Sequence, residues 1–165
     1  YWYFRVHYTC FSRHNHLIIS CCLCLKLSVF KNRIQYDTLK VYMTKIAIIE
    51  DDATINQMYR MKFEADGFDV RIANNGKIGV ELVASFAPDV ILLDLQMPEM
   101  NGAEALKHIR AQDSSKTTPV IVLTNLGEEE APAEIRSLGI HSYIVKANLT
   151  PRQVVAHVKE AIGTA

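Results

Sequence analysis

The chain has 165 residues, which fits one domain of ordinary size, and its 18 basic and 18 acidic side chains give a formal net charge of zero. The charge is unevenly spread, because residues 43–165 hold 12 Lys and Arg against 17 Asp and Glu, whereas residues 1–42 hold 6 against 1. The balance of −5 in the longer part argues against a nucleic-acid surface, and its lack of cysteine means that it needs no disulfides.

Residues 1–42 differ from the rest and carry all four cysteines. Their longest apolar run, 17–30, is interrupted by a lysine and is shorter than the ~20 residues that a membrane helix needs. No small-residue signal-peptide cleavage site follows it, and the Cys and His spacing lacks the paired order of a zinc site. The chain begins with Tyr1, and Met43 stands just before the first predicted strand. We expect residues 1–42 to be an atypical extension, non-functional or disordered, and residues 43–165 to form the domain.

Five apolar runs of strand length follow Met43, and segments of helical period separate them, which is typical of an α/β fold with a parallel sheet. The first run is apolar throughout, as expected for a strand that is covered on both faces. The predicted strands are 45–49, 70–73, 89–94, 119–124 and 142–146.

Two helices are predicted between the first three strands. The first has an apolar stripe at Ile55, Tyr59 and Phe63, and we expect it to end at Gly67. The predicted buried stripe of the second consists of Ile78, Leu82 and Phe86.

Three more helices complete the alternation. Two are predicted over 103–111, with Leu106 and Ile109 facing inward, and over 128–138. The last begins with Thr150 as N-cap and Pro151 in its first turn, a favoured pairing. Its predicted buried stripe consists of Val154, Val158 and Ile162. Short connections and right-handed crossovers favour a doubly wound sheet between two helical layers, which binds ligands at the carboxyl ends of its strands.

Acidic side chains gather at these carboxyl ends. Glu50, Asp51 and Asp52 follow the first strand, and Asp94 ends the third. Two carboxylates ~4 Å apart repel each other by roughly 4 kcal/mol at an effective dielectric constant of 20, so their convergence favours a bound cation. Oxygen ligands suit Mg²⁺, which keeps several waters and also binds substrate phosphates.

A hydroxyl and an ammonium group join the acidic residues, because Thr124 ends the fourth predicted strand and Lys146 the fifth. Each residue alone has an ordinary role as a turn, a cap or a surface charge. Together they suit phosphoryl transfer, in which charge neutralisation and positioning do most of the catalysis. Asp94 is the candidate nucleophile, because carboxylates can form acyl phosphates.

Four segments strengthen this interpretation, and they are 48–52, 92–102, 122–124 and 143–146. The second contains Asp94, Met97, Pro98 and Gly102 in a highly specific Asp-x-x-Met-Pro-x-x-x-Gly pattern. From about residue 44 to residue 163 the sequence resembles the receiver domain of bacterial two-component response regulators. The resemblance implies a five-stranded parallel sheet of flavodoxin-like topology, with strand order 2-1-3-4-5 in three α/β/α layers.

The resemblance also implies roles for the acidic residues. Asp94 would accept a phosphoryl group from a phosphohistidine of a sensor histidine kinase or phosphotransfer protein. Asp51 and Asp94 would bind Mg²⁺ directly, Glu50 would act mostly through water, and the backbone carbonyl of Gln96 would be a further ligand. The protein would catalyse only its own phosphorylation and dephosphorylation, so it would not be an enzyme in the ordinary sense.

The remaining matched residues concern signalling. Thr124 and Lys146 would contact the phosphoryl group, and Tyr143 would be the aromatic residue whose ring turns inward on activation. The implied output is a cytoplasmic, stand-alone receiver that binds a downstream protein through its fourth helix, fifth strand and fifth helix. We expect no DNA-binding domain and no membrane segment.

Two positions depart from the family pattern. Ala147 follows Lys146, where the family usually has a proline in a cis peptide, so we expect a trans peptide and a different loop shape. Asn125 stands where a small residue is common, which predicts altered donor access or dephosphorylation rate.

Other functions fit the sequence less well. A flavodoxin-like redox protein would not place Glu50, Asp51 and Asp52 against a flavin phosphate. A dehalogenase-type phosphatase needs an aspartate at the position of Gln96, and the nucleotide-binding glycine motifs are lacking. The alternatives that stay open are a pseudo-receiver, which keeps the fold without being phosphorylated, and an intermediate phosphate carrier.

Overall fold

The computed structural model describes residues 43–163. The predicted extension over residues 1–42 lies outside this range. In the part of the chain that is described, no helix combines the length and the apolar character needed to cross a membrane.

The sheet has five parallel strands: β1 (Lys45–Ile49), β2 (Asp69–Ala73), β3 (Val90–Leu93), β4 (Val120–Thr124) and β5 (Ser142–Val145). Their order is β2-β1-β3-β4-β5, which confirms the predicted topology. The observed strands agree with the predicted ones to within one residue at each end. Lys146 lies just beyond β5, at the start of the short 3-10 helix η2 (Lys146–Asn148).

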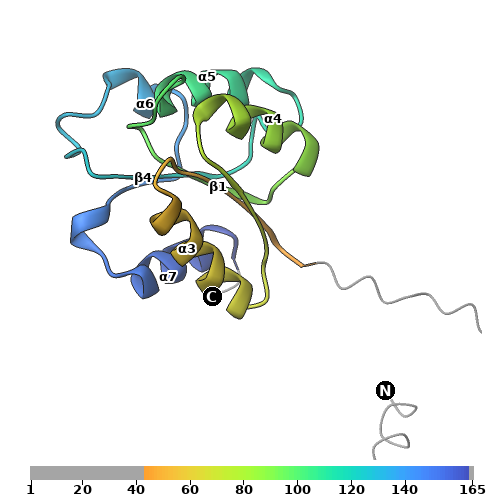
Figure 1. Ribbon diagram of the computed structural model, residues 1–165. Coiled ribbons are helices and arrows are strands. Elements are labelled where there is room, and N and C mark those ends of the chain that lie inside the picture. The colour runs from red at the N-terminus through yellow and green to blue at the C-terminus, as the bar shows by residue number, and fades with distance from the viewer. Residues whose placement is uncertain (1–42, 164–165) are drawn as a thin grey trace, which may run out of the picture. The chain divides into compact units, whose positions relative to one another are not determined.

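Helices cover both faces of the sheet, as Figure 1 shows. One layer contains α4 (Gly76–Phe86), α5 (Gly102–Ala111) and α6 (Ala133–Ser137), and the other contains α3 (Ala53–Ala65) and α7 (Pro151–Ala161). Alternate residues of the buried strands point to the two layers, so the sheet separates two apolar cores. This confirms the doubly wound, three-layer fold.

The ends of α3 and α7 follow the predicted signals. Gly67, just after α3, has a φ of 87°, a left-handed conformation that glycine adopts easily. Thr150 and Gln153 form a capping box at the start of α7, with Pro151 as the first helical residue. Val154 and Val158 are buried, and Ile162 packs against the same core from just beyond the helix.

The predicted buried stripe of α4 was partly wrong. Phe86 is buried, but Ile78 is 43% exposed, and the face that meets the sheet contains Gly79 and Val83. A Cβ atom at Gly79 would lie only 2.7 Å from side-chain atoms of Ile49. The helix therefore packs through a glycine, which an apolar stripe cannot reveal, and this rotates Ile78 out to solvent.

The predicted helix over 128–138 was too long, because α6 spans only Ala133–Ser137. Pro132 explains the difference. A residue that precedes proline is sterically pushed out of the helical region, so Ala131 cannot easily continue a helix into Pro132. Glu128, Glu129 and Glu130 consequently lie in turns before the helix.

Arg110, near the end of α5, joins two chain segments at the amino-terminal end of the sheet. Its guanidinium donates hydrogen bonds of 2.8–3.0 Å to four backbone carbonyls, those of Ser115, Thr118, Leu138 and Gly139. The first two precede β4 and the other two precede β5. Burial lowers the pKa of Arg110. The side chain thus fastens α5 and both segments together, at the end of the sheet opposite to Asp94.

Candidate functional site

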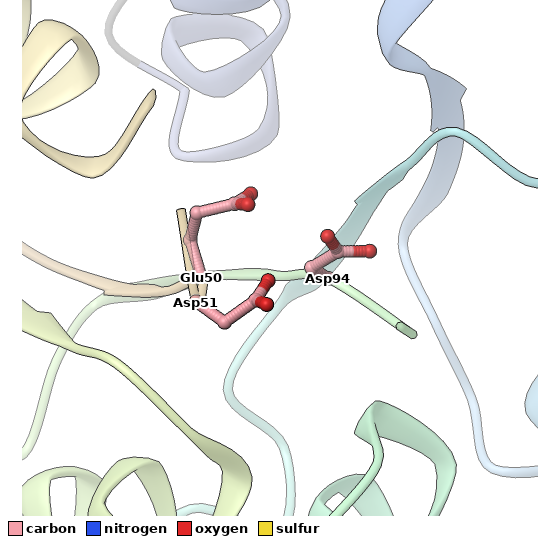
Figure 2. Close-up of side chains that lie close together, drawn as sticks. All are labelled: Glu50, Asp51 and Asp94. Atoms are coloured by element: carbon pink, nitrogen blue, oxygen red, sulfur yellow. The ribbon is translucent and has the colours of Figure 1, made fainter. Parts of the chain in front are cut away.

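Three carboxylates converge at the carboxyl ends of β1 and β3, as Figure 2 shows. Glu50 and Asp51 follow β1, and Asp94 follows β3. The two strands are hydrogen-bonded neighbours, and the Asp94 amide donates to the carbonyl of Ile49 at 2.9 Å. Carboxylate oxygens of the three residues lie within 4.8 Å of one another. The sheet therefore brings these acidic residues together, although Asp51 and Asp94 are 43 positions apart in the sequence.

The three consecutive acidic residues after β1 occupy different environments. Glu50 is buried, with 3% of its surface exposed, whereas Asp51 is exposed. Within residues 43–163, the Asp51 side chain has no hydrogen bond or ion pair. Asp52 caps α3, because its carboxylate accepts hydrogen bonds from the amides of Ile55 and Thr54, which lower its pKa. Asp52 is thereby committed to the helix, and Glu50 and Asp51 remain for the site.

Lys146 is the basic member of the site. Its Nζ lies 2.5 Å from Oε2 of Glu50 and 2.7 Å from Oδ2 of Asp94. Burial alone would lower the pKa of Lys146, but the hydrogen bonds and charges of Asp94 and Glu50 outweigh it and raise this pKa. The pKa of Glu50 is raised, chiefly by burial, although the hydrogen bond and charge of Lys146 act in the opposite direction. One ammonium group is thus shared between two buried carboxylates.

The donor set fits a hard divalent cation such as Mg²⁺. All the ligand atoms offered by Glu50, Asp51 and Asp94 are carboxylate oxygens, the type that Mg²⁺ prefers. Lys146 neutralises only one of three negative charges. The exposed position of Asp51 leaves one side of the cluster open to water and to a phosphate ligand.

Thr124 and Tyr143 lie beside the acidic cluster on neighbouring strands. Thr124 ends β4, is fully buried, and its hydroxyl accepts a 3.4 Å hydrogen bond from the Leu126 amide. Tyr143 on β5 is half-buried, and its hydroxyl donates to the Leu126 carbonyl at 3.0 Å. Burial is the main cause that raises the pKa of Tyr143. The loop after Thr124 is therefore held from both sides by these two residues.

Gln96 lies in the loop after β3, where its amide donates a 3.1 Å hydrogen bond to Oδ1 of Asp94. Its side chain is exposed. Further along this loop Glu99 has a φ of 65°, a left-handed conformation unusual for glutamate. Its carboxylate accepts a 3.2 Å hydrogen bond from the side chain of Asn75, the N-cap of α4. These bonds tie the acceptor loop to Asp94 and to α4.

The two positions that depart from the family pattern lie at the edge of the site. Asn125 is exposed, directly after Thr124. The peptide between Lys146 and Ala147 is trans, since residues 43–163 contain no cis peptide bond. This agrees with the expectation for alanine at this position.

Asn56 belongs to the site although it is not among the site residues predicted from the sequence. It is 2% exposed, and its Nδ2 donates to the backbone carbonyls of Glu50 at 2.6 Å and Ala73 at 3.1 Å. A signal for it does exist in the sequence. Asn56, Tyr59 and Phe63 follow the spacing of a buried helix face, and a polar residue on such a face requires partners.

Together, the five-stranded doubly wound sheet and an acidic cluster with a buried lysine define a receiver-type domain. A family model described as "response regulator receiver domain" matches residues 46–159. The chain therefore belongs to the family of response regulator receiver domains.

Similar proteins agree with this assignment. The transcriptional regulatory protein ResD of Bacillus subtilis is 37% identical over 122 residues, which are 74% of this chain and 49% of ResD. The chain spans about half the length, or less, of the curated relatives it matches.

Solved structures show the same fold. The chemotaxis protein CheY4 of Vibrio cholerae has a TM-score of 0.67 and 28% identity, and the match covers 72% of this chain and 98% of CheY4. The receiver domain of the sensor histidine kinase PA1611 of Pseudomonas aeruginosa has a TM-score of 0.65 and 22% identity, with 73% and 98% covered. The PA1611 structure contains a magnesium ion coordinated in its active-site cleft.

Proposed function

We propose that this protein is a phosphorylation-dependent signalling protein of a two-component system, in which Asp94 accepts a phosphoryl group. The donor would be a phosphohistidine of a sensor histidine kinase or a phosphotransfer protein, and the reaction would occur in the cytoplasm, where such kinases have ATP. One observation carries the proposal. Glu50, Asp51 and Asp94 converge at the binding end of a doubly wound sheet, where Lys146 contacts Glu50 and Asp94.

In the proposed step, a carboxylate oxygen of Asp94 forms a bond to phosphorus while the bond from phosphorus to the donor imidazole nitrogen breaks. The electron pair of the broken bond returns to the imidazole, which takes up a proton. Lys146 already contacts Oδ2 of Asp94 and supplies positive charge where the phosphoryl oxygens arrive. The buried Thr124 hydroxyl would donate a hydrogen bond to one of these oxygens.

Asp51, Asp94 and the Gln96 carbonyl would bind Mg²⁺ directly, and Glu50 would do so through water. The ion would supply the positive charge that stabilises a transferring phosphoryl group. The magnesium ion in the receiver domain of PA1611 supports this ligand class for the fold.

Phosphorylation itself is tested by incubating the full chain with acetyl phosphate, with and without Mg²⁺, and measuring the mass of the protein by intact-mass spectrometry. We expect one phosphoryl adduct, formed only with Mg²⁺. The same assay on a chain shortened to begin at Met43 tests the proposal that residues 43–165 suffice. A chain that folds and binds Mg²⁺ but never acquires the adduct would be a pseudo-receiver.

We expect millimolar Mg²⁺ to raise the melting temperature, because it relieves the repulsion among Glu50, Asp51 and Asp94. At a hundredfold excess over its dissociation constant, a ligand of the folded state adds about 2.7 kcal/mol of stability. Asp51→Ala should lose most of this gain, whereas Asp113→Ala, at an exposed acidic residue in the loop after α5, should keep it. A wild-type melting temperature that ignores Mg²⁺ would contradict the metal site.

Tyr143 is proposed as the switch residue. It lies opposite Val122 in the sheet, two residues before Thr124, so Tyr143 and Thr124 share a face. If Thr124 moves toward the phosphoryl group, the space that it leaves can accept the Tyr143 ring. The partner-binding surface would then consist of α6, β5 and α7, biased by phosphorylation.

Backbone NMR with the phosphoryl mimic beryllofluoride tests the switch. We expect shift changes that extend from the Asp94 loops through α6, β5 and α7. Changes confined to the loops around Asp94, with residues 128–160 undisturbed, would refute the switch and favour a simple phosphate carrier.

A further inference from the structure

Asn56 in the first turn of α3 makes contacts that the proposed phosphoryl transfer does not use. The side chain is almost completely buried, and both contacts of its Nδ2 are to backbone carbonyls, of Glu50 at 2.6 Å and of Ala73 at 3.1 Å. These two carbonyls stand at the carboxyl ends of β1 and β2. The Ala73 carbonyl also accepts a 3.0 Å hydrogen bond from the Glu50 amide. The side-chain amide of Asn56 therefore links the carboxyl ends of β1 and β2, next to the acidic pair Glu50 and Asp51.

The Glu50 carbonyl has a direct relation to Asp51. It belongs to the peptide unit that joins the two residues, and this unit is planar. A hydrogen bond that fixes the carbonyl therefore also fixes the amide and the Cα atom of Asp51, from which its side chain leaves the chain. Because the Asp51 carboxylate has no polar contact of its own among the described residues, its position depends on this backbone.

The remaining polar atom of Asn56, its Oδ1, lowers the stability of the folded protein. This atom is buried and is the one side-chain N or O atom within residues 43–163 that is buried without a hydrogen-bond partner. An unsatisfied buried acceptor destabilises a protein, so the stabilising contacts of this side chain are those of its Nδ2. What it provides is the pair of N–H donors.

We propose that Asn56 is a positioning residue for the acidic pair, which fixes the Glu50–Asp51 peptide and thereby presents Asp51 to the divalent cation. This role rests on the proposed function of the site and adds a residue that touches neither the cation nor the phosphoryl group. Loss of the two N–H donors should weaken cation binding beyond any effect on folding.

The test uses the full chain, with Mg²⁺ as the probe in isothermal titration calorimetry and urea unfolding in parallel. Asn56→Leu keeps the branching of the side chain at Cγ, is somewhat larger, and removes both donors. We expect its dissociation constant for Mg²⁺ to rise by about tenfold, as for residues that orient metal ligands. Asn56→Ser, which is smaller and keeps one hydroxyl donor, should give a smaller rise and serves if the leucine variant does not fold.

Ser115→Ala is the matched control. Ser115 is also 2% exposed, and its hydroxyl donates to the Ile109 carbonyl at 2.7 Å, at the end of the domain that is remote from the site. Its loss should lower stability while leaving Mg²⁺ affinity within about twofold, well under the tenfold step that corresponds to 1.4 kcal/mol. If Asn56 variants bind Mg²⁺ as tightly as this control, the positioning role is refuted. A wild-type chain that does not bind Mg²⁺ would instead refute the proposed function, and the positioning role with it.

Discussion

Asp94→Asn is expected to abolish phosphorylation by acetyl phosphate and to leave the fold intact. The amide has nearly the shape of the carboxylate but cannot form an acyl phosphate. The backbone contact that places residue 94, from its own amide to the Ile49 carbonyl, does not involve the side chain. Lys146 also keeps its ion pair with Glu50, so the buried ammonium group is not left without a partner.

Intact-mass spectrometry measures this result as the presence or absence of a phosphoryl adduct. Asp113→Asn is the control for loss of a negative charge, since Asp113 is exposed and lies in the loop after α5. It should be phosphorylated like the wild type. A complete adduct on the Asp94→Asn chain would show that another residue is the acceptor.

Arg110→Met is expected to destabilise the domain by about 3 kcal/mol. Hydrogen bonds that involve a charged group contribute roughly 1.5–3 kcal/mol each, and they are not additive. Methionine keeps the apolar stem of the side chain but leaves four carbonyls without their donor. The stability of Arg110→Lys should lie between those of the wild type and Arg110→Met, because an ammonium group has three donors but cannot reproduce the planar fork of the guanidinium.

Urea unfolding measures this loss as a lower midpoint. Arg136→Ala is the control, because Arg136 pairs with Glu128 at 2.9 Å on the surface, where both side chains are more than half exposed. Exposed ion pairs contribute about 0–1 kcal/mol, so the control should change little. Equal midpoints for Arg110→Met and Arg136→Ala would mean that the four hydrogen bonds do not stabilise the domain.

The sequence was sufficient for the sheet, because each strand is a short apolar run whose burial on both faces requires that composition. It was less informative for helices. Gly79 turns α4 so that Ile78 faces solvent, and Pro132 delays the start of α6, since both act through backbone geometry. An apolar stripe records only which side chains are large and apolar, so it misses both effects.

The acidic cluster could be predicted because parallel strands bring their carboxyl ends to one edge of the sheet. The different tasks of Glu50 and Asp52 could not be predicted, since they depend on side-chain direction after the strand ends. The contacts of Asn56 and Arg110 were also hidden, because backbone carbonyls exist at every residue and leave no mark in a sequence.

The separation between Arg110 and the acidic cluster has a consequence for how such a domain can change. The guanidinium secures the segments that enter β4 and β5, whereas the chemistry lies where these strands end. Libraries that randomise exposed positions such as Gln96 and Asn125 should therefore yield many folded variants with altered phosphoryl lifetimes. Libraries around Arg110 should yield mostly destabilised chains. Residues that can change without loss of the fold and residues that hold the fold together thus lie at opposite ends of the same strands.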